Sequence, residues 1–337
     1  MNCQNGLTLN QKEFIFTREV PFESCHASTL VVLPGGQIMS AWFGGSQEGA
    51  GDVAIWGSWR ENGQWSQPVK VADRDDLPHW NPVLFRDREN KIYLFYKVGW
   101  EIPDWRTRVM VSQDGKNWSD PRPLVPGDRG GRGPVKNKPL IREDGTWLAP
   151  ASLETEDRWD AFVDLSRDRG ETWQKSELVP LQRADQKEAE TKESVVVEGK
   201  GVIQPTLWTS GPKTVHMLLR STEGRVFRSD SRDGGWTWSM AYPVEVPNNN
   251  SGLDAVQTRD GNLILVCNPV EKNWGPRSPL TIFLSTDNGT GWQRIMDLEE
   301  GAGEYSYPSA VIEDKTIHLT YTYDRARIVY VGLKLHI

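Results

Sequence analysis

Polar side chains stand at the start of six otherwise apolar, strand-like runs. Imidazole, ammonium, amide, carboxylate and phenol groups are among them, and these can move protons, bind carboxylates or hold sugar hydroxyls. One such residue would be an ordinary turn group, but six sets in register favour a polar pocket of sugar size. The sets are His26 and Ser28; His79 and Asn81; Lys136, Asn137 and Lys138; Gln204 and Thr206; Asn250, Ser251 and Asp254; Glu304, Tyr305, Ser306 and Tyr307.

The runs that carry these residues are copies of one unit. Each unit has a polar start, a short apolar strand, a turn and a second apolar strand, as in "CHASTLVVLPGGQIMSAWFGG" from Cys25. Six units in 337 residues average about 56 residues each, within the range for four-stranded propeller blades. The sequence therefore predicts an all-β fold, a six-bladed β-propeller of four-stranded antiparallel blades. We expect a single domain over residues 1–337, with residues 1–11 as a flexible extension and Lys12 to Val20 closing the ring.

A second repeat, S-x-D-x-G-x-x-W with one copy (SQDGKNW) a residue shorter, follows strand-like runs and precedes further ones. Its aspartates are Asp114, Asp168, Asp233 and Asp287, separated by 54, 65 and 54 residues. Asp accepts backbone N–H groups in turns and Gly tolerates positive φ, so each copy is typical of a hairpin whose Trp packs back on it. The interpretation is a structural turn rather than a ligand site.

These hairpins on a sixfold β pattern resemble the sialidase (neuraminidase) superfamily, whose hallmark is this Asp-box, or BNR repeat. The resemblance covers the chain from about Glu13 to its end. It implies a propeller whose boxes lie away from the active site. It also implies a carboxylate-binding arginine cluster, an Asp acid/base, and a Tyr nucleophile paired with a Glu.

Several residues match those roles, and two positions depart from the pattern. Asp52 in "GGSQEGAGDVAIW" matches the acid, with Glu48 as a second candidate, and Arg220 in "HMLLRS" matches one arginine. Tyr305 in "EYSYPSA" matches the nucleophile. His26 stands where the family has an arginine in Phe-Arg-Ile-Pro, and Gln204, which cannot act as a base, stands where it has the Glu. Other candidates are Tyr307 beside the nucleophile, Glu304 as a substitute base, and Arg325, Arg327 or Arg132 as a further arginine.

We therefore expect an exo-acting glycoside hydrolase on an acidic glycan. The expected catalytic residues are Asp52, Tyr305, His26 and His79. The expected substrate-binding residues are Arg220, Lys136, Lys138, Gln204, Asn81, Glu48, Asp254, Tyr307 and Arg325. Two alternatives stay open: a uronate lyase, in which His26, His79 or Tyr305 moves protons, and a non-catalytic glycan-binding propeller.

Charge and composition restrict the classes of molecule that the protein is expected to bind. The net charge is −7, which argues against a general nucleic-acid surface, and no apolar run approaches the about 18 residues of a membrane helix. The Cys and His residues lack metal-ligand spacing, so we expect neither metal nor cofactor. The start of the sequence lacks signal-peptide features, and Cys3, Cys25 and Cys267 form no C-x-x-C pair, so the expected location is the cytoplasm.

Overall fold

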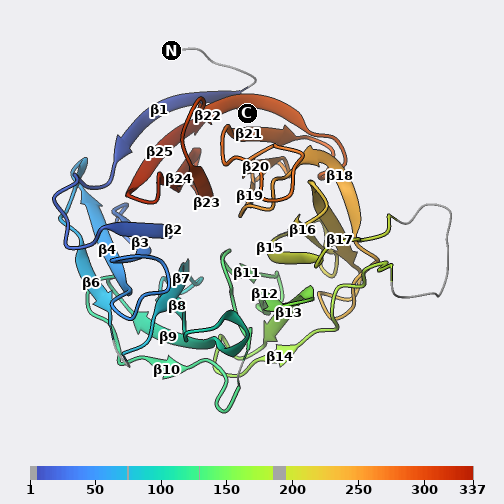
Figure 1. Cartoon of the computed structure of the whole chain (residues 1–337), viewed down its shortest axis with the longest axis horizontal. Helices are drawn as coiled ribbons and strands as arrows, with labels where there is room; N and C mark the ends of the chain where they lie inside the picture. The colour runs from blue at the N-terminus through green and yellow to red at the C-terminus, as the bar shows by residue number, and fades with distance from the viewer. Residues whose placement is uncertain (1–5, 74–75, 129, 185–194, 337) are drawn as a thin grey trace.

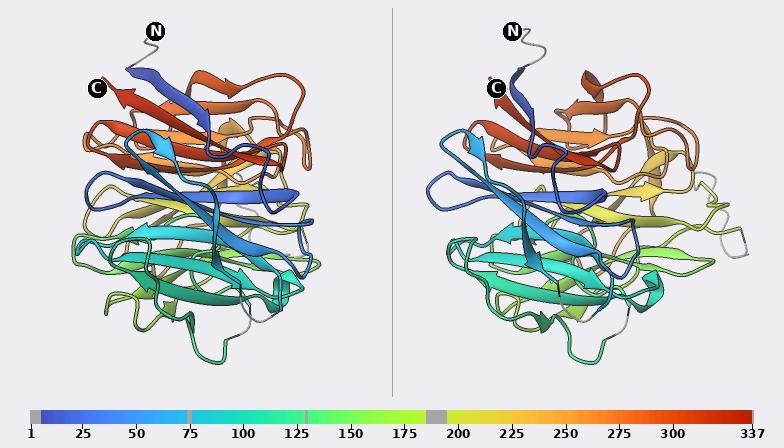
Figure 2. Two further views of the ribbon diagram at one scale, coloured as in Figure 1. Left: turned by 90° about the vertical axis from the view of Figure 1, so that its left-hand side faces the viewer. Right: turned by 60° about the vertical axis from the view of Figure 1, so that its left-hand side comes forward.

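Six antiparallel sheets surround a central axis in the computed structural model, which describes residues 6–73, 76–128, 130–184 and 195–336 (Figure 1). The chain runs around the ring once, and each sheet is one blade. The architecture confirms the predicted six-bladed propeller. Figure 2 shows the sheets from the side.

The innermost strand comes first along the chain in every blade. The first blade contains β2 (Ser24–Val32), β3 (Ile38–Gly45), β4 (Ala54–Glu61), β5 (Gln64–Trp65) and β6 (Val69–Ala72). The second contains β7 (His79–Arg86), β8 (Ile92–Val98), β9 (Arg106–Ser112) and β10 (Arg122–Pro123), and the third β11 (Leu140–Ile141), β12 (Trp147–Glu154), β13 (Trp159–Ser166) and β14 (Gln174–Lys175). The fourth contains β15 (Val202–Thr209), β16 (Val215–Ser221), β17 (Arg225–Ser231) and β18 (Tyr242–Pro247). The fifth contains β19 (Asp254–Gln257), β20 (Leu263–Cys267), β21 (Leu280–Ser285) and β22 (Gln293–Glu299).

The sixth blade is completed from the other end of the chain. It contains β23 (Tyr305–Glu313), β24 (Thr316–Tyr323), β25 (Arg327–Leu335) and, outermost, β1 (Leu7–Phe14), which pairs antiparallel with β25. Closure near the N-terminus was expected, but the pairing segment starts at Leu7 rather than Lys12. Residues 7–11, expected to be flexible, thus belong to a sheet.

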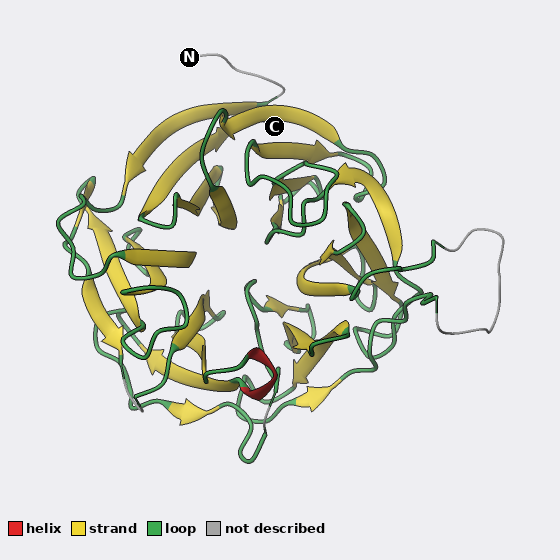
Figure 3. Cartoon of the chain, in the orientation of Figure 1, coloured by secondary structure: helices red, strands yellow, loops and turns green. Residues whose placement is uncertain are grey.

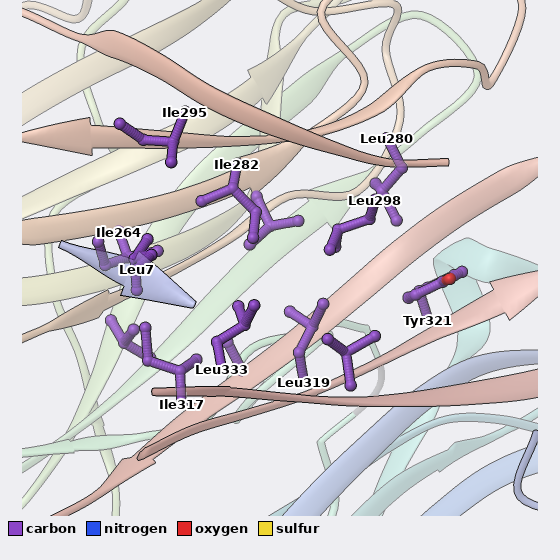
Figure 4. Close-up of a cluster of buried hydrophobic side chains, with 14 of the residues drawn as sticks. Leu7, Ile264, Leu280, Ile282, Ile295, Leu298, Ile317, Leu319, Tyr321 and Leu333 are labelled. Carbon is purple, nitrogen blue, oxygen red and sulfur yellow. The ribbon is translucent and has the colours of Figure 1, made fainter. Parts of the chain in front are cut away.

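Burial explains why these runs form strands. β3 and β8 are buried at every position, because neighbouring blades cover both faces of a middle strand. The edge strand β1 alternates toward solvent after its first two residues. Six buried apolar clusters result, one between each pair of adjacent blades. Figure 4 shows the cluster between the fifth and sixth blades, where Leu7 lies beside Ile264.

The Asp-boxes form the hairpins that the sequence predicts. Asp233 accepts hydrogen bonds from Ser231 Oγ (2.8 Å) and from the backbone N–H groups of Trp236 and Thr237 (both 3.0 Å). The box tryptophans Trp118, Trp173, Trp238 and Trp292 join the clusters against the preceding blade. The boxes therefore hold blade to blade, as the interpretation of a structural turn requires.

Almost no helix accompanies the strands. The described residues contain one 3-10 helix, η1 (Ile102–Asp104), coloured red in Figure 3. No helix in this part of the chain is long and apolar enough to cross a membrane. The segment Gln182 to Ser194, the one polar helix-tolerant stretch of the sequence, lies largely outside the described residues.

Four inner strands carry a bulge at the same place, two to three residues from their start. The pairing register shifts between His26 and Thr29, Trp80 and Val83, Ile203 and Thr206, and Ser306 and Ser309. The bulges contain the non-glycine positive-φ residues Ala27 (53°), Asn81 (39°), Gln204 (54°) and Tyr307 (55°). Bulges of this kind re-aim side chains and are common beside functional sites. These four lie at one end of the central channel that the inner strands surround, so this end is the candidate location of a site.

Candidate functional site

Tyr307 lies at the centre of a buried polar cluster at this end of the channel. Arg220 Nη1 donates to its Oη at 2.7 Å, and the His26 ring lies 4.3 Å from its ring, centroid to centroid. The guanidinium carbon of Arg277 is 5.4 Å from the same ring. A Cβ at Gly252 would lie 3.2 Å from Tyr307 Cδ2, so the backbone of the fifth blade approaches the phenol closely. Three blades besides the sixth thus position one tyrosine.

Arg220, 4% exposed, is held by neutral groups. Its Nε donates to Asn250 Oδ1 at 2.7 Å, and Nη1 donates to Gln204 Oε1 at 3.1 Å as well as to Tyr307. The indoles of Trp159 and Trp274 flank the guanidinium, with centroids 5.5 and 5.7 Å from its carbon. None of these hydrogen-bond partners carries a charge, so the guanidinium is suited to pairing with an anionic ligand.

Two more arginines reach the same region from hairpin loops. Glu304 Oε1 accepts hydrogen bonds from Arg277 Nη1 and Arg325 Nε, both at 2.8 Å. Glu48, on the loop between β3 and β4, pairs with Arg325 Nη1. A cavity of about 450 Å³ adjoins these groups and is lined by Asn249, Trp274, Gly275, Pro276, Arg277, Gly303, Glu304 and Arg325. That volume suits a ligand of sugar size.

His26 is neutral in this surrounding. Burial lowers its pKa well below the ordinary value, and the positive charges of Arg325, Arg277, Arg220 and Lys136 lower it further. Its Nδ1 lies 3.0 Å from Thr322 Oγ1. The imidazole therefore serves as a hydrogen-bonding group rather than a fourth cation, unlike the family's arginine at this position.

Lys136 bounds the cluster along the inner strands. Its Nζ donates to Asn137 Oδ1 and to Leu253 O, both at 2.9 Å, and to Pro308 O. Burial lowers its pKa to about 7. The ammonium group, expected to bind substrate, instead joins the third, fifth and sixth blades.

Lys138 and Asp254 were also expected to bind substrate, but they satisfy each other. Lys138 Nζ lies 2.9 Å from Asp254 Oδ2, which also accepts the N–H of Ala310 at 2.9 Å. Lys138 lines a different cavity, of about 330 Å³, made from the far ends of the inner strands. The Lys138–Asp254 pair is thus separated from Tyr307, because the Lys136 ammonium lies between them along the inner strands.

The structure places Tyr305 outside the cluster. Its ring is buried between the fifth and sixth blades, 4.9 Å from the ring of Tyr323, and its hydroxyl donates to Ala302 O at 2.9 Å. Tyr307, two residues on, occupies the position expected of Tyr305. In a regular strand both would share one face, but the bulge re-aims Tyr307 toward the axis.

The remaining expected residues lie around or beside the mouth. His79 stacks on Tyr96 and its Nδ1 is 2.8 Å from Leu77 O, so it packs within the second blade rather than beside Tyr307. Asn81 occupies the bulge position of that blade. Asp52, on the loop between β3 and β4, accepts hydrogen bonds from Ser46 N–H and Oγ, both at 2.9 Å. Asp52 therefore lies on the same loop of the first blade as Glu48.

Sequence reasoning missed four groups of this cluster: Arg277, Asn250 as an arginine partner, and the two indoles beside Arg220. It also missed Glu154, which ends β12; burial raises the pKa of this carboxyl, and the nearby charges of Arg220 and Lys97 oppose that rise. Of the other arginines considered, Arg132 pairs with Asp164 and Arg327 stacks on Phe14. The signal that could have found Arg277 was its position in the repeat. Like Glu48 and Arg325, it lies between the second and third strands of its blade.

No group of His, Cys, Asp and Glu residues suited to a metal ion occurs among the described residues. The arrangement is instead a cationic, aromatic-flanked cluster around one tyrosine, beside a pocket lined by Arg277, Arg325 and Trp274. Such a pocket can bind a carboxylate and hold a sugar ring against the indoles.

Comparisons with known proteins agree with this architecture. Similar solved structures include a protein of unknown function from Dyadobacter fermentans, the NanB sialidase from Streptococcus pneumoniae and the Trypanosoma rangeli sialidase bound to the inhibitor DANA. Their TM-scores are 0.75, 0.69 and 0.73, and their identities 16%, 12% and 15%. Each comparison covers 98% of this chain, and respectively 100%, 71% and 60% of the other. Identities this low show the fold alone.

A search of curated proteins finds no match. The sequence does match the family described as BNR repeat-like domain over residues 36–319, most of the chain. Together with the Asp-boxes and the six blades, this match shows that the chain belongs to the BNR repeat-like family and has the propeller fold of sialidases.

Proposed function

We propose that this protein is an exo-acting glycoside hydrolase that cleaves an acidic sugar from a glycan. One observation carries the proposal: Arg220, Arg277 and Arg325 converge around Tyr307, and the recorded hydrogen bonds of Arg220 go only to neutral groups. A sugar carboxylate would complete the charge of Arg220, and Arg277 borders the adjoining cavity. The likeness of the fold to sialidases supports the same class of substrate.

In this proposal Tyr307 Oη bonds to the anomeric carbon as its proton passes to the neutral imidazole of His26, whose ring lies 4.3 Å from the phenol ring, centroid to centroid. A neutral phenol approaches a centre that carries a carboxylate with less repulsion than a second carboxylate would. The leaving oxygen takes a proton from a rim carboxyl, and water then releases the sugar from the tyrosine. Asp52 and Glu154 are the two candidate proton donors; Asp52 matches the family position, and the raised pKa of Glu154 keeps it closer to its protonated form.

A specific observation favours elimination as the second candidate. The hydrogen bond recorded at Tyr307 Oη comes from Arg220, whereas the neighbouring Gln204 cannot accept a proton as the family's Glu does. A tyrosine held by an arginine, beside a neutral His26, is suited to moving the proton next to a uronate carboxylate. Hydrolysis and elimination thus differ in the product rather than in the carboxylate-binding residues.

The test is a set of sialosides and uronate-terminated oligosaccharides incubated with the full chain. Release of a free acidic sugar supports hydrolysis, and an unsaturated uronide, detected by its absorbance, supports elimination. Arg220→Met should abolish either activity, whereas Arg86→Met, a matched change at the far end of the channel beside Glu313, should not. Asp52→Asn and Glu154→Gln identify the proton donor. If no acidic glycan is turned over or bound, the proposal is wrong.

A further inference from the structure

A second cluster of reactive side chains lies on the fourth blade, at the opposite end from the arginine cluster. Ser210 follows β15, His216 lies in β16 and Asp230 in β17, where it pairs in register with His216. His216 and Arg220 share one strand and are four residues apart, about 13 Å along it. The two clusters therefore do not share a pocket.

The three side chains form a connected chain of hydrogen bonds. Ser210 Oγ lies 2.7 Å from His216 Nε2, and His216 Nδ1 bonds to Asp230 Oδ1. Ser210 is exposed, whereas His216 is 5% exposed and stacks on Trp208 with a centroid separation of 5.0 Å. An accessible hydroxyl is thus joined to a buried imidazole and a carboxylate, in the order that activates a serine nucleophile.

The surroundings fix this order of donors and acceptors. Asp230 also accepts from Arg228 Nε at 2.9 Å and from Tyr242 Oη at 3.0 Å. Burial alone would raise the pKa of Asp230, but the hydrogen bonds of His216 and Arg228 and the Arg228 charge lower it below its ordinary value. The ionised carboxylate accepts a hydrogen bond from Nδ1–H, which leaves Nδ1 no lone pair for Arg228 Nη2, 3.1 Å away. Nε2 is then the acceptor that faces Ser210.

A side-chain amide from the next blade points at the same place. Asn288 Oδ1 accepts Trp208 Nε1 at 2.8 Å, which fixes the amide so that Nδ2 lies 3.3 Å from His216 Nε2. The amide N–H groups of Asn288 are next to the serine–histidine contact. A donor in this position stabilises an oxyanion formed at a carbonyl that the serine attacks.

The turn that carries Ser210 is anchored on both sides. Ser210 N–H donates to Thr214 O at 3.2 Å, Arg142 Nη2 donates to Pro212 O at 2.7 Å, and Gly234 N–H donates to Lys213 O at 2.8 Å. The Asp-box of the same blade therefore holds the turn in place. A nucleophile on a fixed turn loses little entropy when it reacts.

We propose that Ser210, His216, Asp230 and Asn288 form an acyl-transfer site for carboxylic esters. Ser210 Oγ bonds to the ester carbonyl carbon, its proton passes to His216 Nε2, and the ester C–O bond breaks as that proton reaches the leaving alcohol. Water, deprotonated by the same nitrogen, then cleaves the acyl-serine and gives the carboxylic acid. Asp230 positions the imidazole.

The first test is covalent labelling of the full chain with a fluorophosphonate, which reports a base-activated serine without needing the natural ester. Trypsin should release the peptide Gly201 to Lys213, in which Ser210 is the one serine, carrying the phosphonyl group. His216→Gln should lower the labelling rate at least about 100-fold, because it removes the general base. Arg86→Met, at the same end of the propeller but on the second blade, is the control and should label like the unaltered chain.

The second test is hydrolysis of 4-nitrophenyl acetate. Ser210→Ala should abolish it, and Asn288→Ala should lower it by about 100-fold. Ser210 is exposed, so its alanine variant keeps the fold and carries the test even where His216→Gln unfolds. An unlabelled Ser210 in the unaltered chain, or equal labelling in His216→Gln, would overturn the proposal.

Discussion

Replacing Tyr307 and Tyr305 separately by Phe tests which tyrosine lies at the reaction centre. Both changes remove one hydroxyl from the same strand. Tyr307→Phe takes one acceptor from the buried Arg220, which keeps Asn250 and Gln204. Hydrogen bonds to charged groups contribute about 1.5–3 kcal/mol to stability, so we expect a loss in that range. Tyr305→Phe removes a neutral bond to Ala302 O and should cost about 1 kcal/mol.

Turnover should separate the two variants far more than stability does. Loss of the attacking or proton-carrying oxygen should lower turnover by at least about 1,000-fold in Tyr307→Phe, which is about 4 kcal/mol of transition-state stabilisation. Tyr305→Phe should stay within about twofold, because its hydroxyl points to a backbone carbonyl in the blade interface. The assay compares product release by the two variants on the acidic glycan that the unaltered chain turns over.

Denaturant unfolding of both variants provides the necessary control. It shows whether a loss of turnover comes from unfolding, since Tyr307→Phe is also the more destabilising change. If Tyr305→Phe were inactive and fully folded while Tyr307→Phe remained active, the arginine cluster would not be the reaction centre. The whole assignment of the site would then be refuted.

Four further predictions concern the turns, the packing and the charges. Asp233→Ala should destabilise the fold by roughly 1–2 kcal/mol in urea unfolding, because the hydrogen bonds of Asp233 close a hairpin. The activity of the folded fraction should stay unchanged, and a selective loss of turnover would contradict this. Gly252→Ala should reduce turnover, since its Cβ would meet Lys136 Cε at 3.1 Å and the Tyr307 ring at 3.2 Å and shift both side chains; unaltered turnover would speak against that placement. The pKa of His26 is lowered in the folded chain, so the imidazole is neutral there and only the unfolded chain binds the extra proton. The free energy of unfolding should therefore decrease as pH falls below about 6.5, and it should decrease less steeply in His26→Gln. Gln204→Glu should weaken binding of acidic sugars about tenfold in calorimetry, because it gives the buried guanidinium an internal anion; tighter binding would show that the ligand needs no such cation.

The fold could be predicted from the sequence because its determinants repeat. Six apolar units and four Asp-boxes specify the blade count, and each box needs only Ser, Asp, Gly and Trp at a spacing that varies by one residue. The box contacts are local, within six residues, so the pattern shows them directly. Closure of the ring was harder to place, because β1 and β25 pair across almost the full length of the chain.

The site was only partly predictable because backbone irregularity decides it. Strand alternation puts Tyr305 and Tyr307 on one face, and only the bulge with φ of 55° at Tyr307 separates them. A signal was present: the bulge residue precedes Pro82, Pro205 and Pro308 in three blades. Arg277 was missed for another reason, since it lies on a long loop after β20 whose path no periodicity describes.

The charges around Tyr307 show how the two departures from the sialidase pattern, His26 and Gln204, bear on the proposed binding of an anion. Glu48 and Glu304 both bond to Arg325, and Glu304 also bonds to Arg277, so two carboxylates are committed to these two arginines. Gln204, in place of a carboxylate, accepts from Arg220 without neutralising it. A histidine in place of the first arginine removes one cation but leaves a neutral group, because nearby cations and burial keep it deprotonated. The two exchanges therefore act in opposite directions on the charge of the site, and Arg220 keeps only neutral hydrogen-bond partners, with the Glu154 carboxyl as the nearby acid.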